Sequence, residues 1–117
     1  VTERSEPVGA TLFANRFAFD AKRWRIPPDD MKRTFRPSLA YRLAALGEQK
    51  ADAMLTFRDS WEWDLAAGVL IAAEAGAKVT DRNGAPLVFN APHPKTPGVL
   101  AASPKLHGAL IARMAPT

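Results

Sequence analysis

Cysteine is absent from the 117 residues of the chain. Disulfide bonds and thiolate metal sites are therefore excluded, and the redox compartment is left open. Long hydrophobic runs are absent too, because the longest uncharged apolar stretch, residues 65–73, is far shorter than the ~20 residues that cross a bilayer. The sequence thus predicts a protein without a membrane segment, which we expect to be cytoplasmic.

Paired histidines are missing as well, because His93 lies among prolines and His107 in an expected helix. This spacing is not typical of zinc sites, so we interpret both histidines as structural or surface residues. The first residues lack both an initiator methionine and the basic-then-apolar order of a signal peptide. We therefore expect a chain that begins inside a longer protein.

Strand-like and helical patterns alternate along the chain, which predicts an α/β fold built in layers. Ser38 and Ser103 precede periodic apolar segments and are expected to cap helices. Asn83 and Gly84 form a dipeptide that is typical of hairpin turns. The expected helices cover residues 39–46, 65–75 and 104–114, and the expected strands cover residues 10–15, 51–57, 77–80, 86–89 and 98–102.

Positive charge is concentrated between residues 21 and 37, where the surplus of basic over acidic residues equals the net charge of +4 of the whole chain. One interpretation of this basic segment is an electrostatic footprint for phosphate groups, on a small substrate or on a nucleic acid. The other is a solvated, proline-rich loop, which we favour because no nucleic-acid-binding motif accompanies the charges. The charged residues of the segment are Lys22, Arg23, Arg25, Lys32, Arg33 and Arg36, against Asp29 and Asp30.

Asp64 is the most informative single residue, because it precedes the almost entirely apolar helix expected at residues 65–75. Such a helix should be covered on all sides by other layers. A strand at residues 51–57 and a short loop at residues 58–63 would bring Asp64 to the carboxyl end of a strand. Ligands of α/β proteins bind at that end, where loops and helix N-termini converge. Asp64 is therefore either the N-cap of the helix or a ligand of a metal ion.

The string Trp-Asp-Leu-Ala-Ala-Gly at residues 63–68 runs into a helix end with the sequence Glu-Ala-Gly at residues 74–76. It resembles the second signature of the inositol monophosphatase superfamily of magnesium-dependent phosphatases. The resemblance extends from Thr11 to Arg113 and follows the order of the carboxy-terminal half of these enzymes. Within the superfamily, residues 36–42, 50–54 and 61–64 most resemble bacterial 3'(2'),5'-bisphosphate nucleotidases and inositol monophosphatase-like proteins.

This resemblance implies a fold and part of an active site. Residues 1–117 would form the layered αβα carboxy-terminal domain of the sugar-phosphatase fold, a mixed sheet with helices on both faces. Asp64 would be one ligand of Mg²⁺. The other ligands in the family come from an upstream Glu and an Asp-Pro-Leu/Ile-Asp-Gly-Thr motif, which belong to an amino-terminal half that these residues do not contain. The complete protein would hydrolyse a phosphomonoester with a metal-activated water, and we expect this chain to be inactive by itself.

Two residues of the first expected helix are candidate substrate ligands by the same resemblance. Arg42 stands where the nucleotidases carry a Lys that meets a substrate phosphate, and Ser38 matches a small hydroxyl residue near the substrate. A surface arginine and a plain N-cap are the structural alternatives. Inositol-binding members place a Glu about seven residues before the signature Asp. Residues 55–58 contain no carboxylate, so Arg58 and Asp59 could line the pocket instead.

The expected partners are a small phosphorylated metabolite, the amino-terminal half of the same protein and a second copy, since family members commonly dimerise. The metabolite could be a 3'(2'),5'-bisphosphate nucleotide, an inositol phosphate or a sugar phosphate. A small basic nucleic-acid-binding module that uses residues 22–36, and a non-catalytic oligomerisation domain, are the alternatives from other classes. We rank the phosphatase first, because the signature has no purpose in a nucleic-acid-binding module.

Overall fold

A five-stranded sheet with the strand order β2-β1-β3-β5-β4 forms the middle of the molecule. The computed structural model describes residues 1–87 and 95–115, and for residues 59, 61–64, 95 and 96 it describes the backbone alone. The strands are β1 (Thr11–Phe13), β2 (Lys32–Thr34), β3 (Ala53–Trp61), β4 (Lys78–Thr80) and β5 (Lys95–Ala102). The helices are α1 (Leu39–Gly47), α2 (Glu62–Glu74) and α3 (Pro104–Arg113), with short 3-10 helices η1 (Arg16–Phe19), η2 (Ala21–Arg23) and η3 (Pro28–Asp30).

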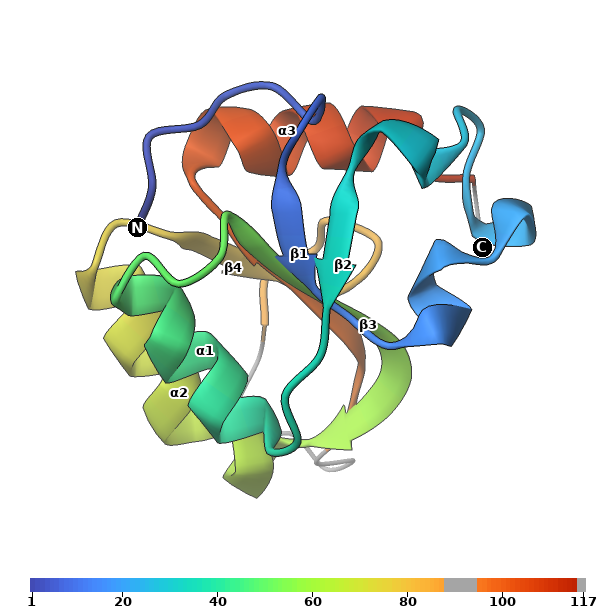
Figure 1. The fold of residues 1–117 in the computed structure, drawn as a ribbon. Coiled ribbons are helices and arrows are strands. Elements are labelled where there is room, and N and C mark those ends of the chain that lie inside the picture. The colour runs from blue at the N-terminus through green and yellow to red at the C-terminus, as the bar shows by residue number, and fades with distance from the viewer. Residues whose placement is uncertain (88–94, 116–117) are drawn as a thin grey trace.

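The sheet is mixed, as the resemblance implied. β1 pairs in parallel with β2 on one side and with β3 on the other. β5 runs antiparallel to both β3 and β4. Because β1, β2 and β3 point the same way, their carboxyl ends meet at one edge of the sheet and their amino ends at the opposite edge (Figure 1). We call these the carboxyl edge and the amino edge.

Alternating side chains of the strands divide the core into two layers, as expected for strands buried on both faces. Leu12, Leu55 and Leu100 belong to the cluster that also holds Leu106 and Leu110 of α3. The neighbouring positions, such as Met54 and Val99, belong to the cluster under α1 and α2. Figure 1 shows α3 on one side of the sheet and the α1–α2 pair on the other. The predicted αβα fold is therefore confirmed.

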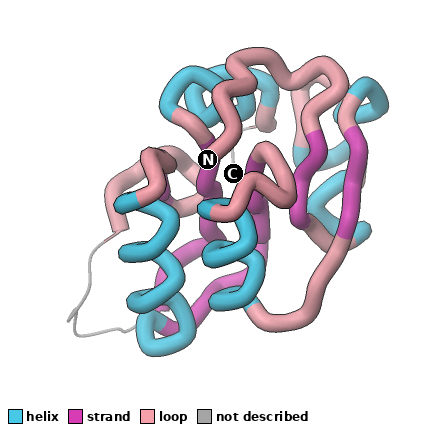
Figure 2. Tube along the Cα trace, turned by 60° about the vertical axis from the view of Figure 1, so that its left-hand side comes forward, coloured by secondary structure: helices cyan, strands magenta, loops and turns pink. Residues whose placement is uncertain are grey.

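The two glycines of the signature have structural roles in α2. A Cβ atom on Gly68 would lie 2.9 Å from Cδ1 of Leu43, so the missing side chain lets α2 pack closely on α1. The two helices lie side by side in both views (Figure 2). Gly76 has a φ of 101°, and the N–H groups of Gly76 and Ala77 donate to the carbonyls of Ala73 and Ala72. This Schellman motif ends the helix.

The start and the outer face of α2 differ from the sequence prediction. No loop separates β3 from α2, because the strand continues to Trp61 and the helix begins at Glu62. Asp64 is therefore the third residue of α2, and its interpretation as the N-cap is wrong. The helix is not covered on all sides within this chain either, because Leu70 is 62% exposed and Ile71 49% exposed.

The basic segment, expected as a proline-rich loop over residues 21–37, is folded onto the α3 side of the sheet. It contains η2, η3 and β2. The indole of Trp24 is buried and donates to the carbonyl of Ala18 at 2.7 Å. Arg113 of α3 donates to the carboxylate of Asp30 at 2.8 Å and to the carbonyl of Pro27 at 2.6 Å. The hydrogen bond from Arg113 to the carboxylate lowers the pKa of Asp30. The contacts with α3 were not predictable from local composition.

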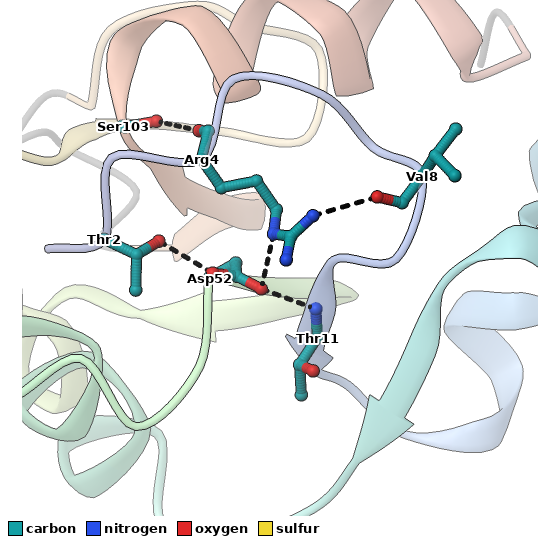
Figure 3. Close-up of polar contacts among 6 residues, drawn as sticks. All are labelled: Thr2, Arg4, Val8, Thr11, Asp52 and Ser103. Atoms are coloured by element: carbon teal, nitrogen blue, oxygen red, sulfur yellow. Dashed lines mark hydrogen bonds and ion pairs between the residues drawn. The ribbon is translucent and has the colours of Figure 1, made fainter.

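Charges at the amino edge are compensated by Asp52, which precedes β3 (Figure 3). Its carboxylate accepts hydrogen bonds from the hydroxyl of Thr2 and the N–H of Thr11, each at 2.8 Å. Nε of Arg4 lies 3.2 Å from the same carboxylate. The hydroxyl of Ser103 donates to the carbonyl of Arg4 at 2.8 Å and makes no capping bond to α3. The N-terminal segment is thereby fixed to the residue that precedes β3 and to the start of α3.

A buried polar pair joins α3 to β4. Nε2 of His107 lies 2.7 Å from Oγ1 of Thr80, whose own hydroxyl donates to the carbonyl of Asp81. Nε2 must therefore carry the proton in this contact. Burial, followed by the positive charge of Lys78, lowers the pKa of His107 to about 4. The structural interpretation of His107 is confirmed, whereas His93 lies outside the described residues.

The turn at Asn83 and Gly84 is confirmed as well, since Thr80 and Pro86 form an antiparallel bridge across it. Gly84 has a φ of 85°, which suits a glycine in a tight turn. Of the strand expected at residues 86–89, the last two residues lie outside the described part of the chain. Among the helices described, none has the length and apolar character needed to cross a membrane.

Candidate active site

The carboxyl edge gathers the residues that the sequence analysis selected. The chain leaves β2 at Phe35 and enters α1 through Ser38, and it passes from β3 directly into α2. The N-termini of both helices therefore lie at the edge where parallel strands end. Helix N-termini carry free N–H groups and a partial positive charge, so this edge favours anions.

Ser38 is the N-cap of α1, as predicted, and Oγ accepts a hydrogen bond from the N–H of Tyr41 at 3.3 Å. Its backbone is unusual for a cap because φ is 70° and ψ is 110°. A positive φ at a residue with a side chain is strained, by about 1–3 kcal/mol, and such strain is frequent at functional sites. Ser38 lines a surface hollow of about 350 Å³ together with Arg36, Pro37 and Tyr41.

Arg42 lies one helical turn after Ser38 and is partly buried. Its guanidinium carbon is 5.1 Å from the centre of the Phe35 ring, an arrangement that allows a cation–π interaction. Nε of Arg42 is buried and has no hydrogen-bond partner in the described part of the chain. Burial and then the charge of Arg58 lower the pKa of this guanidinium. The geometry therefore places a positive charge at the carboxyl edge, and none of the described side chains bonds to Nε of this guanidinium.

Arg58, whose charge contributes to the lowered pKa of Arg42, lies in a β-bulge that the sequence analysis did not predict. Thr56 pairs with Val99 and Asp59 with Pro97, so two residues of β3 oppose Gly98 alone. Gly98 has a φ of 71°, and a Cβ atom there would collide with the carbonyl oxygen of Thr56. Bulges of this kind redirect side chains next to active sites. The Pro97-Gly98 dipeptide is the sequence signal that could have suggested one.

Arg82 stabilises the bulge from the turn after β4. Its Nη1 donates to the carbonyl of Phe57 at 2.6 Å, and its backbone N–H donates to the carbonyl of Pro97. The N–H of Arg58 donates to Oγ1 of Thr56 at 3.3 Å. These bonds connect both sides of the bulge, so the backbone of Arg58 has a defined position.

The predicted metal ligand is placed only in part. The backbone of Asp64 lies in the first turn of α2 at the carboxyl edge, but its side chain lies outside the described residues, so its role as a ligand stays a prediction. Over residues 1–87 and 95–115, no group of three or more His, Cys, Asp or Glu side chains could hold a metal ion. The described side chains therefore do not form a complete magnesium site, because octahedral Mg²⁺ takes several oxygen ligands.

A family model described as the inositol monophosphatase family matches residues 3–116. The chain belongs to the inositol monophosphatase family. No curated protein sequence matches it at a significant level. The sequence resemblance is thus confirmed, although it was based on a short signature and a few neighbouring motifs.

Solved structures share the fold of this chain, and their coverage shows what part of their length the chain spans. The staphylococcal inositol monophosphatase-II with bound inositol monophosphate has a TM-score of 0.76 and 17% identity, over 94% of this chain and 43% of that chain. The same staphylococcal enzyme with bound 2'AMP has a TM-score of 0.77 and 16% identity, over 95% and 43%. A Pyrococcus horikoshii protein with similarities to inositol-1 monophosphatase has a TM-score of 0.71 and 26% identity, over 97% and 45%. This family member therefore spans less than half the length of the structures that it matches.

Proposed function

We propose that the chain is the carboxy-terminal part of a magnesium-dependent phosphomonoesterase that acts on a small phosphorylated metabolite. Family membership supports this proposal, and the observation that carries it is the carboxyl edge, where two helix N-termini lie and where the buried Nε of Arg42 has no hydrogen-bond partner in the described residues. A 3'(2'),5'-bisphosphate nucleotide, an inositol phosphate and a sugar phosphate remain the candidate substrates. The staphylococcal relative binds both an inositol phosphate and a nucleotide, in agreement with this range.

The proposed roles follow from position and chemistry. Asp64, in the first turn of α2, contributes one oxygen ligand to Mg²⁺, and carboxylates outside this chain contribute the others. The bound ion supplies a water activated for attack on phosphorus and binds the phosphoryl oxygens. Arg42 binds a substrate phosphate with its guanidinium, and Ser38 fixes the start of α1 beside the substrate. In this proposal the described residues bind and orient the substrate, and hydrolysis requires the rest of the enzyme.

We further propose that the amino-terminal half of the enzyme covers the outer face of α2. Leu70 and Ile71 are exposed there on an apolar helix, although large apolar side chains are normally buried. A contact on this face would bring the missing metal ligands close to the N-terminus of α2. A homodimer through the same face is the competing possibility.

Complementation tests this proposal. The chain alone should release no phosphate from a panel of phosphomonoesters with Mg²⁺, whereas addition of the amino-terminal half of the Pyrococcus horikoshii relative should give a complex with magnesium-dependent turnover. Leu70→Asp should abolish association, and Val8→Asp should not, because Val8 is equally exposed, at 62%, but precedes the amino edge. Asp64→Asn should abolish turnover without affecting association.

Three results would contradict the proposal. Brisk turnover by the chain alone would show that it needs no second half. A complex that forms and stays inactive would refute the phosphatase assignment. Self-association of the chain that excludes the added half, and that Leu70→Asp disrupts, would show that the α2 face is a dimer interface.

A further inference from the structure

The chain from η1 to the residues that follow η2 has an inner face and an outer face. Ala18 and Trp24 belong to the core cluster under α3, and their exposed fractions are 1% and 5%. Phe17 is 67% exposed and Ile26 is 53% exposed, although both side chains are large and apolar. Single exposed apolar side chains are ordinary, but two in one short segment indicate an interaction site when polar residues surround them.

Bonds to the rest of the molecule hold this segment in place. The indole of Trp24 donates to the carbonyl of Ala18 at 2.7 Å. The backbone N–H groups of Arg25 and Ile26 donate to the carbonyl of Arg113, at the end of α3, at 2.8 and 3.3 Å. Figure 1 shows these short turns in blue at the right-hand side of the molecule. The inner face is filled by Ala18 and Trp24, which leaves the apolar side chains of the outer face in solvent.

Basic side chains accompany the two exposed apolar ones. Arg16, Lys22 and Arg25 are exposed, and residues 16–26 contain four basic residues against one acidic residue. That acidic residue, Asp20, is the N-cap of η2, where Oδ1 accepts a hydrogen bond from the N–H of Lys22 at 3.0 Å. We call the exposed side chains of this segment the η1–η2 surface. Its members are Arg16, Phe17, Lys22, Arg25 and Ile26.

The outer face of α2 is a useful comparison. Leu70 and Ile71 are exposed there too, but residues 65–73 contain no charged residue. An uncharged apolar face suits another protein, whereas an apolar surface with cations around it suits an anionic amphiphile. The two surfaces lie on opposite sides of the sheet, because Trp24 packs in the α3 cluster and Leu65 in the α1–α2 cluster. A protein partner on α2 would therefore leave the η1–η2 surface free.

We propose that the η1–η2 surface binds the face of a membrane that contains anionic lipids. The cations attract the negative headgroups, and Phe17 and Ile26 enter the boundary between headgroups and acyl chains. A nucleic acid fits less well, because the aliphatic Ile26 cannot stack on a base, and 3-10 helices of four and three residues are too short to read a groove. The inference goes beyond the proposed function and does not depend on it.

The first test is sedimentation of the whole chain with vesicles of phosphatidylcholine, with and without phosphatidylglycerol. The chain should bind only the vesicles that contain phosphatidylglycerol, and added salt should weaken binding because it screens the cations. Phe17→Ser and Ile26→Ser should each weaken binding about tenfold. Lys22→Gln should weaken it about fivefold. Leu70→Ser and Lys50→Gln are the matched controls and should leave binding unchanged, because these exposed side chains lie on the α1–α2 side.

The second test detects insertion into the membrane directly. Because the chain has no cysteine, Phe17→Cys and Leu70→Cys can each carry an environment-sensitive fluorescent dye at a single position. With phosphatidylglycerol vesicles, the emission of the dye at position 17 should shift to shorter wavelength, because the dye leaves water. The dye at position 70 should show no shift.

Equal binding to vesicles of phosphatidylcholine alone would overturn the inference, and so would vesicle binding without a shift at position 17. An equal loss of binding in Leu70→Ser would also overturn it. Binding to single-stranded or duplex DNA in place of vesicles, weakened by Lys22→Gln, would assign the η1–η2 surface to a nucleic acid instead. The urea midpoints of the serine variants should match that of the natural chain, since both side chains are exposed, and this separates lost binding from lost folding.

Discussion

The amino edge and the carboxyl edge of the three parallel strands differ in how their charged side chains are bonded. At the amino edge, the carboxylate of Asp52 is surrounded by donors from Thr2, Arg4 and Thr11. At the carboxyl edge, Nε of Arg42 is buried and has no hydrogen-bond partner in the described residues. Compensated charges keep a fold together, and uncompensated charges attract a ligand. The comparison therefore assigns stability to the amino edge and binding to the carboxyl edge.

The topology explains why positive charge gathers at the carboxyl edge and an acceptor is needed at the amino edge. Both α1 and α2 begin at the carboxyl edge, so their N-terminal dipoles add to the positive charge of the arginines. At the amino edge, the first N–H of β1 is left free by the sheet and is satisfied by a side chain that precedes β3. The amino ends of the strands thus need an internal acceptor, while at the carboxyl edge the starts of α1 and α2 present free N–H donors.

The largest expected effect on stability comes from removing the carboxylate of Asp52, which accepts the hydrogen bonds of the amino edge. Asp52→Ala leaves the N–H of Thr11 and the hydroxyl of Thr2 without their acceptor, so the free energy of unfolding should fall by about 3 kcal/mol in urea titrations. Arg4→Gln is the control and should cost less than about 1 kcal/mol, because the Arg4 side chain is 40% exposed. A folded Asp52→Ala protein with weaker phosphate binding would contradict the separation of the two edges.

The second effect tests the packing behind the carboxyl edge. Gly68→Ala places a methyl group against Leu43 and should lower stability by about 2 kcal/mol, because a filled helix contact cannot accept a side chain. Gly108→Ala in α3 is matched in chemistry but has no atom within 4 Å of the added Cβ. It should raise stability by up to about 1 kcal/mol through helix propensity. If both substitutions stabilise the protein, α1 and α2 are not in close contact.

The third prediction concerns the pH dependence of stability caused by His107, which lies at neither edge. The pKa of His107 is about 4 in the fold and about 6.5 when unfolded, so below pH 6.5 the unfolded chain binds more protons. Stability is therefore complete above pH 6.5 and is lost as the pH falls towards 4, by about 2 kcal/mol at pH 5. His107→Gln should remove this difference in stability between pH 7 and pH 5, measured by urea titrations at the two pH values. Equal pH slopes for the two proteins would show that His107 is not buried in neutral form.

Local patterns in the sequence predicted the three helices, the strands β1, β3, β4 and β5 and the layers, but not β2 or the direct passage from β3 into α2. Alternation and helix caps are properties of neighbouring residues, so they could be recognised from the sequence. Ser38 as a cap and the Asn83-Gly84 turn are examples. The position of Arg58 was not predictable, since it depends on the bulge that Gly98 imposes from another strand. The folding of the basic segment likewise depends on Arg113, far away in the sequence. Asp64 was selected through the family resemblance, and its ligand role awaits the experiments proposed above.

The smallest expected effect concerns strain at the carboxyl edge. Ser38 combines a capping hydroxyl with a φ of 70°, which glycine adopts without steric cost. Ser38→Ala loses the cap and keeps the strain, so stability should fall by about 1 kcal/mol. Ser38→Gly loses only a few tenths as a cap and relieves the strain, so stability should equal or exceed that of the natural chain by up to about 1 kcal/mol. If Ser38→Gly also weakens phosphate binding, the strained serine favours binding over stability, in line with the contrast between the edges. Equal destabilisation by both substitutions in urea titrations would show that the backbone at Ser38 carries no strain.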